Sequence, residues 1–532
     1  MKDTFARKPL LWLLLGAALT AVPVIFPIFG ALQWVASIPM LIGLYRLFDT
    51  EKCKLWKAYR YGFLTVYVYY FFIYHWFVNL YPLDFVGLDS GASIVVVAAG
   101  WFGLPLLQAV LGGFIFLLYA LIQRSGLFER ISLLRPFVFA SLWTVFEYSS
   151  TIGWTGVPWG RIALGQVECL PMLQSASLFG SYFIGWLLMA VNGLIAYWLL
   201  YRTKALVCGI VAGALLLSNL TFGLVALAIP EDPNAKTATV AVIQGNISSH
   251  DKWNGSASAR EIYAELIRDA ADEGAELVLL PETAFPTRLT GENRKFVSRI
   301  ARECQIYLVV GAFASDAEMN EYNALYMVDP EGEISDTVYA KRHLVPFGEY
   351  VPMRAVTELL IAPLADLNLG SDLTEGTDTA LFDTPWGKLG SLICFDSIYE
   401  QLTVDTARDG AELILLSTND SWFRDSKAVY QHLSHAQLRA VESGRDIIRS
   451  ANTGISAIIS ADGSAEQTIE PLVKGYAVGT VTLRTQKTLY TVIGNLFVFL
   501  CMGFVVMAVF SKLLFRALEA LRSRIRAKQK TA

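Results

Sequence analysis

The sequence predicts a polytopic α-helical membrane protein of about eight transmembrane helices that carries an extracytoplasmic α/β domain. Three observations support this fold class. Of the 532 residues, 54% are hydrophobic and only 17% are charged, which is too apolar for an ordinary soluble chain. Apolar stretches long enough to cross about 30 Å of hydrocarbon recur along the chain. Between two of them lies a long segment of ordinary charge, in which short strand-like and helical runs alternate.

Eight apolar stretches are the predicted membrane spans. Five of them, each about 20 residues long, are residues 10–30, 62–80, 176–200, 205–229 and 491–510. Three are less regular, and they are residues 31–45, 93–122 and 136–148. The first span follows the basic segment MKDTFARK but has no small-residue cleavage site, so we expect a retained anchor rather than a signal peptide.

Basic residues occur in every second loop between these spans. They are Lys2, Arg7, Lys8, Arg46, Lys52, Lys54, Lys57, Arg60, Arg124, Arg130, Arg135, Arg202, Lys204, Arg516, Arg522, Arg524, Arg526, Lys528 and Lys530. Under the positive-inside rule, this pattern predicts cytoplasmic termini, with the long segment between the seventh and eighth spans on the outer face. An odd number of spans would place the basic tail on the wrong side.

Composition divides the chain into three parts. We expect a transmembrane domain of about seven helices at residues 1–229, an α/β domain at 230–486, and a last span with a basic tail at 487–532. In the α/β part, strands are predicted at 238–245, 275–282, 306–313, 387–394, 411–420, 446–450 and 455–460, with a hairpin over 322–341. Helices are predicted at 256–274, 294–304, from the end of the 387–394 strand to about 410, and at 428–444. This alternation is typical of a layered sheet domain.

Charge and cysteine content narrow the possible functions. A net charge of −4 gives no nucleic-acid footprint. The six cysteines show no paired spacing that would predict a disulfide framework. His432 and His435 have a spacing that can bind a metal, but no third ligand or HExxH pattern accompanies them. We therefore expect no metal and no cofactor.

Three polar residues stand at the carboxyl ends of predicted apolar strands: Glu282, Lys341 and Cys394. Ligand sites of open α/β sheets gather at that edge. A helix that starts after Cys394 would favour its thiolate. A carboxylate can take the thiol proton, and a lysine can stabilise an oxyanion, so the three together suit acyl transfer through a thioester. Taken singly, each residue also fits a purely structural role.

The α/β segment resembles the carbon-nitrogen hydrolase (nitrilase) superfamily, and the full chain is similar to its membrane-embedded members. The matching stretches are VIQGNISSHDKW (242–253), LLPETAFP (279–286), YNALY (322–326), KRHLVPFGEYVP (341–352), ICFD (393–396), NDSWF (419–423), QHLSHAQLRAVESGR (431–445) and RSANTGISA (449–457). The resemblance implies an α-β-β-α sandwich with a Glu282, Lys341, Cys394 catalytic triad.

The resemblance also implies a phospholipid-dependent acyltransferase of lipoprotein maturation. Cys394 would take the sn-1 acyl chain of phosphatidylethanolamine as a thioester, and the α-amine of a diacylglyceryl-cysteine on an apolipoprotein would then accept it. Glu282 would be the general base, while Lys341 and the backbone N–H after Cys394 would hold the oxyanion. The implied setting is the bacterial inner membrane, with a periplasmic catalytic domain and a monomeric protein.

Several further residues receive supporting roles from the resemblance. Glu349 aligns with an acid that supports the triad, and Asn323 either donates a hydrogen bond near the intermediate or caps a turn. Many superfamily members of this kind carry Cys-Tyr-Glu where this chain has Cys394, Phe395 and Asp396. The shorter acid can still accept hydrogen bonds. The tryptophans assigned to substrate binding are Trp253, Trp159 and Trp422. Trp253, which aligns with a tryptophan near the acyl site, equally fits a position at the membrane interface, and Trp159, in the aromatic loop GWTGVPWG (153–160), equally fits an interfacial belt.

Two other functions stay open at this stage. A membrane-tethered amidase would let water resolve the thioester, although spans on both sides of the α/β domain favour substrates drawn from the bilayer. A non-catalytic receptor or transport accessory with the same fold would not need Cys394. Transport would be favoured by charges inside the spans, and the clear spans contain almost none.

Overall fold

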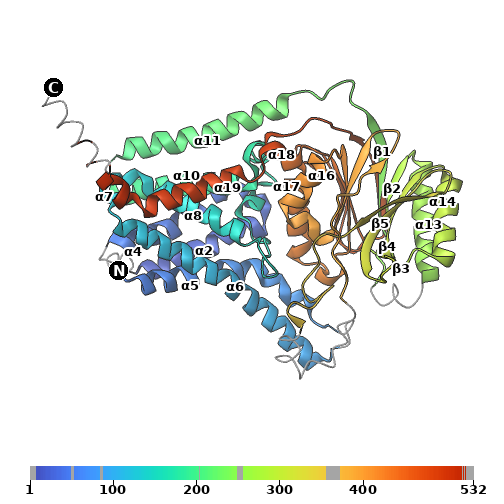
Figure 1. The fold of residues 1–532 in the computed structure, drawn as a ribbon, viewed down its shortest axis with the longest axis horizontal. Coiled ribbons are helices and arrows are strands. Elements are labelled where there is room, and N and C mark those ends of the chain that lie inside the picture. Colours follow the sequence, from blue (N-terminus) through green and yellow to red (C-terminus); the bar gives the residue numbers. More distant parts are fainter. Residues whose placement is uncertain are drawn as a thin grey trace.

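The computed structural model describes residues 8–49, 53–83, 88–202, 204–248, 256–354 and 372–517, together with 519 and 522. A bundle of long helices occupies one end of the molecule and a sheet domain the other (Figure 1). The chain leaves the bundle through α11 (Ala205–Ala228), which leads to β1 (Thr237–Gln244) of the sheet domain. It returns to the bundle after β13 (Gly475–Thr482) through α18 (Leu489–Ile493) and α19 (Leu496–Val509).

The bundle contains most of the apolar stretches as helices. Besides α11 and α19, its long helices are α2 (Pro9–Ile25), α4 (Ile38–Asp49), α5 (Leu55–Ile73), α6 (Ser90–Arg124), α8 (Arg135–Ser149) and α10 (Ala176–Tyr201). Short pieces connect them: η1 (Pro27–Leu32), α3 (Gln33–Ala36), η2 (Tyr74–Leu80), α7 (Leu127–Arg130), η4 (Ser132–Leu134), η5 (Ile162–Gln166) and α9 (Leu170–Leu173). Among the described residues, five helical segments are long and apolar enough to cross a membrane, or six if α19 and its bent continuation count as one. The predicted total of eight spans stays a prediction.

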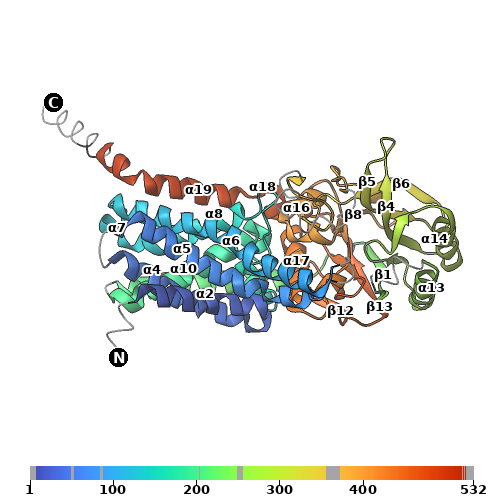
Figure 2. The ribbon, with the colours of Figure 1, turned by 90° about the horizontal axis from the view of Figure 1, so that it is seen from below.

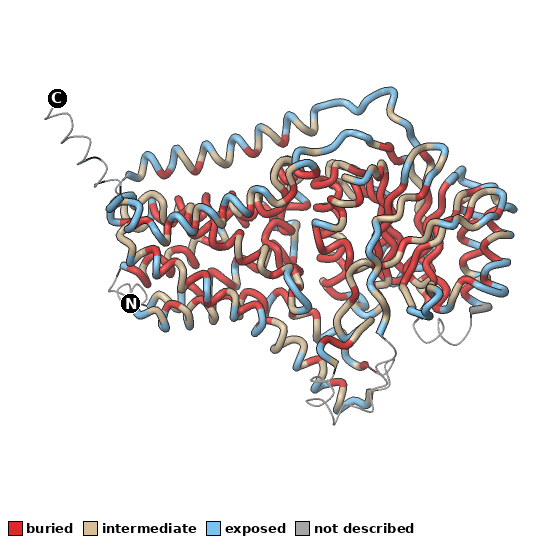
Figure 3. The backbone as a smooth tube through the Cα atoms, viewed as in Figure 1, coloured by how far each residue is buried: buried red, intermediate tan, exposed pale blue. Residues whose placement is uncertain are grey.

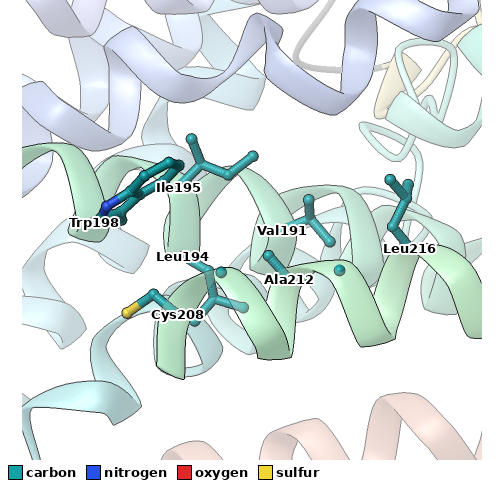
Figure 4. Close-up of a pocket in the computed structure, with 9 residues that line it drawn as sticks. Val191, Leu194, Ile195, Trp198, Cys208, Ala212 and Leu216 are labelled. Atoms are coloured by element: carbon teal, nitrogen blue, oxygen red, sulfur yellow. The ribbon is translucent and has the colours of Figure 1, made fainter. Parts of the chain in front are cut away.

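Helix α11 is packed more loosely than the rest of the bundle. Only 17% of its most apolar window is buried, against 67% for α10, and its exposed course along the outside of the bundle is visible in Figure 3. A cavity of about 210 Å³ lies between these two helices, lined by Val191, Leu194, Ile195, Trp198, Cys208, Gly209, Ala212, Gly213 and Leu216 (Figure 4). Its wall is almost wholly apolar, so the cavity has no arrangement of polar groups that could catalyse a reaction.

Two sheets form the core of the α/β domain. One has the order β13, β1, β2 (Leu277–Leu279), β4 (Tyr307–Ser315), β5 (Glu321–Val328), β6 (Ile334–Ala340), with β3 (Phe285–Arg288) beside β4. The other has the order β12 (Ala465–Ile469), β11 (Ser456–Ile459), β10 (Ile447–Ala451), β9 (Leu413–Thr418), β8 (Lys388–Ile393), β7 (Phe382–Asp383). The expected hairpin is present, because β5 and β6 are antiparallel neighbours. Strands β3, β7, β12 and β13 were not predicted from the sequence.

The domain is an α-β-β-α sandwich, as the resemblance implied. Val240 and Leu279 of the first sheet meet Leu415 and Ile448 of the second in one apolar core. Alternate residues on the other face of the first sheet pack against α13 (Ser256–Asp272) and α14 (Gly291–Cys304). Helices α16 (Glu400–Arg408) and α17 (Lys427–Ser443) cover the second sheet on the side of the bundle (Figure 2).

Helix α17 is buried on two sides. Ala436 and Ala440 pack against strands of the second sheet, whereas Ala428, Leu438 and Val441 belong to the apolar core of the bundle. A helix of a soluble domain normally keeps one polar face in water. The bundle and the sandwich therefore share one continuous interior through α17.

A group of buried ions links the bundle to α16 and α17. This junction cluster consists of Arg161, Glu400, Arg439 and Glu442. Arg161 Nη2 lies 2.9 Å from Glu400 Oε2, and Arg439 Nε lies 2.9 Å from Glu442 Oε2. Helix α10 closes the cluster, because the Tyr182 hydroxyl donates to Glu400 and the backbone N–H of residue 181 donates to Glu442. The cluster fixes the orientation of the sandwich on the bundle.

Candidate active site

The three predicted catalytic residues follow three different strands. Glu282 comes shortly after β2 and Lys341 directly after β6, both in the first sheet, whereas Cys394 follows β8 of the second. Strands β2 and β8, which precede Glu282 and Cys394, are buried, whereas β6, which precedes Lys341, is mostly half-buried. The sequence predicted a site at one sheet edge, and the structure instead builds it from the ends of two sheets.

Lys341 forms the centre of the site. Its Nζ lies 3.0 Å from Glu282 Oε1 and 2.9 Å from Glu349 Oε2. Asn323 Nδ2 donates to both carboxylates, at 2.7 Å to Glu282 and 2.9 Å to Glu349. Glu349 also accepts the backbone N–H of Val345 at 2.9 Å. Asn323 is thus a bridge between the two acids rather than a turn cap.

The charge state of Lys341 follows from these contacts. The side chain is 1% exposed, and such burial favours a neutral amine. The two carboxylates outweigh burial and hold the pKa of Lys341 well above its ordinary value. Lys341 is therefore a fixed ammonium that can stabilise an anion, and it is not the group that accepts a proton.

Cys394 has a strained backbone and a protonated thiol. Its φ of 49° lies in the left-handed region, which side chains rarely adopt. Burial and the negative charge of Glu282 raise the pKa of the thiol, and Lys341 offsets only part of this effect. The resting thiol consequently needs a general base before it can attack a carbonyl carbon.

The helix expected after Cys394 differs from the prediction. Residues Cys394–Ile398 form a short 3₁₀ turn, and the α-helix α16 begins only at Glu400. The helix-dipole argument for a thiolate therefore does not apply to this cysteine. Asp396 caps this turn, because its carboxylate accepts the backbone N–H of Ile393 at 2.9 Å.

Asp396 and Phe395 shape the turn that presents the thiol. Asp396 also accepts the Tyr339 hydroxyl and the backbone N–H of His343, each at 2.8 Å, so the shorter acid does accept hydrogen bonds. Burial raises the pKa of Asp396 to about 6. Phe395 packs against His343 and Tyr399, with ring centroids 5.9 Å and 5.6 Å away, and it contributes packing where a tyrosine would add a hydroxyl.

The three tryptophans assigned to substrate binding lie in different surroundings. Trp159 is 2% exposed, and its ring packs against His432 and His435. This burial argues against an interfacial belt and against direct substrate contact. Trp422 is 40% exposed in the turn Ser421–Phe423 and can meet a ligand. Trp253 lies outside the described residues.

Three residues near Cys394 received no catalytic role from the sequence: Asp420, His432, which was considered only as a metal ligand, and Arg449. His432 Nε2 lies 3.2 Å from the Cys394 carbonyl oxygen, and its Nδ1 lies 2.8 Å from Asp420. Arg449 Nη2 lies 2.6 Å from the second oxygen of Asp420. Each comes from a different stretch that carries the family resemblance, NDSWF, QHLSHAQLRAVESGR and RSANTGISA. Their position in stretches that carry the resemblance is the sequence signal from which a role could have been predicted.

Chemically, the arrangement joins a protonated thiol, a carboxylate base and a fixed ammonium in a buried space between two sheets. A Glu282, Lys341, Cys394 set within an α-β-β-α sandwich defines a protein of the carbon-nitrogen hydrolase class. The sequence model described as carbon-nitrogen hydrolase matches residues 239–487. The model described as apolipoprotein N-acyltransferase N-terminal domain matches residues 16–194.

Similarity extends over nearly the whole chain. The apolipoprotein N-acyltransferase of Geobacter metallireducens is 32% identical over 94% of this chain and 94% of its own length. That of Gloeobacter violaceus is 31% identical over 88% of this chain and 87% of its own. An amidase of Nesterenkonia sp. superposes with a TM-score of 0.37 at 18% identity, over 50% of this chain and 96% of its own. The chain belongs to the apolipoprotein N-acyltransferase family.

Proposed function

We propose that the protein N-acylates the α-amine of the diacylglyceryl-cysteine at the start of apolipoproteins, with the sn-1 acyl chain of phosphatidylethanolamine as donor. The observation that carries this proposal is the buried Glu282, Lys341, Glu349 cluster beside a strained, protonated Cys394. The sandwich that holds it shares its interior with a membrane bundle through α17. Such a site suits substrates whose acyl chains reside in the bilayer.

In the first half-reaction, Glu282 takes the proton of the Cys394 thiol and the sulfur attacks the ester carbonyl carbon of the phospholipid. Lys341 and the backbone N–H after Cys394 stabilise the tetrahedral oxyanion. The C–O bond then breaks, and Glu282 returns the proton to the leaving alkoxide. The products are a lysophospholipid and an acyl thioester on Cys394.

In the second half-reaction, the neutral α-amine of the acceptor attacks the thioester carbon and passes a proton to Glu282. The C–S bond breaks, the amide forms, and the sulfur recovers its proton. Glu349 and Asn323 keep Glu282 and Lys341 in place through both steps, because they share hydrogen bonds with them. One base thus serves two nucleophiles in turn.

The proposed setting is the bacterial inner membrane. Residues 1–229 and 487–532 form the membrane part with eight spans and cytoplasmic termini, and residues 230–486 form the periplasmic catalytic domain. Support comes from the basic segment that includes α7, which lies at the end of the bundle opposite the sandwich (Figure 1). The positive-inside rule assigns that end to the cytoplasm.

The decisive experiment gives purified protein phosphatidylethanolamine and a diacylglyceryl peptide, and follows N-acyl peptide, lysolipid and free fatty acid. We expect peptide acylation in step with lysolipid, and an acyl mass on Cys394 when phospholipid is supplied alone. Cys394→Ser should lower the rate at least about 10³-fold. Cys304→Ser, at a partly buried cysteine of α14, is the matched control and should keep the wild-type rate.

Two results would contradict the proposal. Free fatty acid released at the lysolipid rate without peptide acylation would indicate an amidase-like hydrolase. Full activity of Cys394→Ser would indicate that the thiol has no part in the function.

A further inference from the structure

The backbone of Cys394 needs partners that hold it. A non-glycine residue in the left-handed region persists only where surrounding contacts fix it. The Cys394 carbonyl oxygen has two such contacts: the Ser397 hydroxyl donates to it at 2.8 Å, and His432 Nε2 lies 3.2 Å away. His432 comes from α17, so the nucleophile is tied to the helix shared by sandwich and bundle.

Both ring nitrogens of His432 have partners in the structure. Its Nδ1 faces Asp420 at 2.8 Å. Although burial opposes ionisation, His432 and Arg449 lower the pKa of Asp420 to about 2. The other ring nitrogen, Nε2, faces the Cys394 carbonyl and the Ser397 hydroxyl oxygen at 3.1 Å. Because the Ser397 proton is used on the carbonyl, an N–H on Nε2 can donate to the Cys394 carbonyl oxygen, while Nδ1 lies between Asp420 and the Arg449 guanidinium, which is 3.2 Å away.

His432 and its partners lie on the other side of the sulfur from the Lys341 cluster. There, Arg449 and Asp420 form a buried ion pair with a separation of 2.6 Å, and this pair holds the His432 ring in place. The ring lies close to the nucleophile, since Cys394 Sγ, Asp420 and His432 have ligand atoms within 4.8 Å of one another.

The same three groups have a spacing that could hold a metal ion. Both oxygens of Asp420 are already used, one by His432 and the other by Arg449 at 2.6 Å. The Arg449 guanidinium also lies 3.2 Å from His432 Nδ1, where its charge would repel a cation. The contacts therefore favour a hydrogen-bonded relay over a metal centre.

The bundle completes the surroundings of His432. The Trp159 ring packs on it with a centroid distance of 5.7 Å, and the Trp159 indole N–H donates to Gln431 at 2.8 Å. His432 itself is 0% exposed. A loop of the bundle thus seals His432 from water, which strengthens its hydrogen bonds.

We propose that His432, oriented by Asp420 and Arg449, is a positioning residue for Cys394: it holds the cysteine carbonyl oxygen and so fixes the strained backbone that presents the thiol. The inference rests on the proposed role of Cys394 as the nucleophile. A deletion of the ring should therefore slow every reaction of the thiol, including one that involves no lipid.

The test compares His432→Ala with His432→Gln in the full-length protein in detergent, after thermal melting has verified that each is folded. Alkylation of Cys394 by iodoacetamide is followed by peptide mass spectrometry. We expect His432→Ala to react up to about tenfold more slowly, because one buried hydrogen bond to the cysteine backbone is lost. His432→Gln keeps an N–H donor and should recover a clear part of the rate. Asp420→Asn should slow the reaction as His432→Ala does.

His435 provides the matched control. It lies on the same helix, is equally buried and also packs against Trp159, so His435→Ala should alkylate within about twofold of wild type. Any of three outcomes would overturn the inference. His432→Ala could be alkylated at the wild-type rate, His432→Ala and His432→Gln could react at equal rates, or His435→Ala could lose as much rate as His432→Ala. Because iodoacetamide replaces the phospholipid, these outcomes are independent of whether the peptide acylation assay succeeds.

Discussion

The junction cluster and the cluster around Lys341 are both buried groups of ions, but their charges are arranged differently. In the junction cluster, two arginines face two glutamates. Burial alone would raise the pKa of Glu400, yet Arg161 and Arg439 hold it below its ordinary value. Around Lys341, two carboxylates compete for one ammonium. Matched charges suit a structural connection, whereas an excess carboxylate leaves a base available for chemistry.

The largest expected effect separates the two acids of the Lys341 cluster. Glu282→Gln removes the proposed base, so the rate of acyl-enzyme formation should fall by about 10²- to 10⁴-fold. Glu349→Gln removes only a partner of Lys341 and Asn323, and we expect a loss of about tenfold. The rates are measured as the acyl mass that accumulates on Cys394 with phospholipid alone.

The exposed Glu292 of α14 provides the control, since Glu292→Gln should react like wild type. Equal losses of rate in Glu282→Gln and Glu349→Gln would mean that Glu282 is not a dedicated base. The proposed difference between the Lys341 cluster and the junction cluster would then be wrong.

The junction cluster should respond in stability rather than in chemistry. Arg161→Met leaves Glu400 buried with a more distant arginine, and removing one partner of a buried pair costs about 3–5 kcal/mol. The double variant Arg161→Met, Glu400→Gln should recover part of that loss. Thermal unfolding in detergent measures both.

For comparison, Arg268→Met breaks an exposed pair with Glu303 and should cost less than about 1 kcal/mol. If Arg161→Met were no more destabilised than Arg268→Met, the junction cluster would not be the connection that its geometry indicates.

The smallest effect concerns Asp396, a buried acid that belongs to neither cluster. Its pKa is raised to about 6 by burial, from an ordinary value of about 4. The folded protein therefore keeps a proton that the unfolded chain releases, and this stabilisation is lost as the pH rises from about 4 to 6. Asp396→Asn cannot titrate, so the advantage of wild type in melting temperature should shrink by a few degrees between pH 4 and pH 7. If the difference in melting temperature between wild type and Asp396→Asn instead grew with pH, the raised pKa of Asp396 would be contradicted.

Much of the fold was predictable because its signals are local. The β1 strand and the α13, α14 and α17 helices lie within a few residues of their predicted bounds, since apolar spacing specifies them. The missed strand β12, AEQTI, is polar and mostly exposed, and β13 contains two glycines. Their pairing with β11 and β1 comes from the tertiary fold, which no local pattern encodes.

The candidate site was predictable in its residues but not in its surroundings. Glu282, Lys341 and Cys394 were predicted from strand ends and resemblance. In the structure Glu282 and Lys341 are in contact, and both influence the pKa of the Cys394 thiol; their catalytic roles stay a prediction. The sequence could not show that a 3₁₀ turn, capped by Asp396, follows Cys394 before the α-helix begins. Nor could it show that Trp159 and His432, which are 273 positions apart in the numbering, pack against each other with their rings tilted by 40°.

The shared burial of α17 constrains how this enzyme can be divided. Separating the sandwich from the bundle would expose the apolar face formed by Ala428, Leu438 and Val441, together with the charged residues Glu400, Arg439 and Glu442. Exposed apolar surface of this kind promotes aggregation. A truncated, water-soluble version of this chain would therefore first need a redesigned α17 surface.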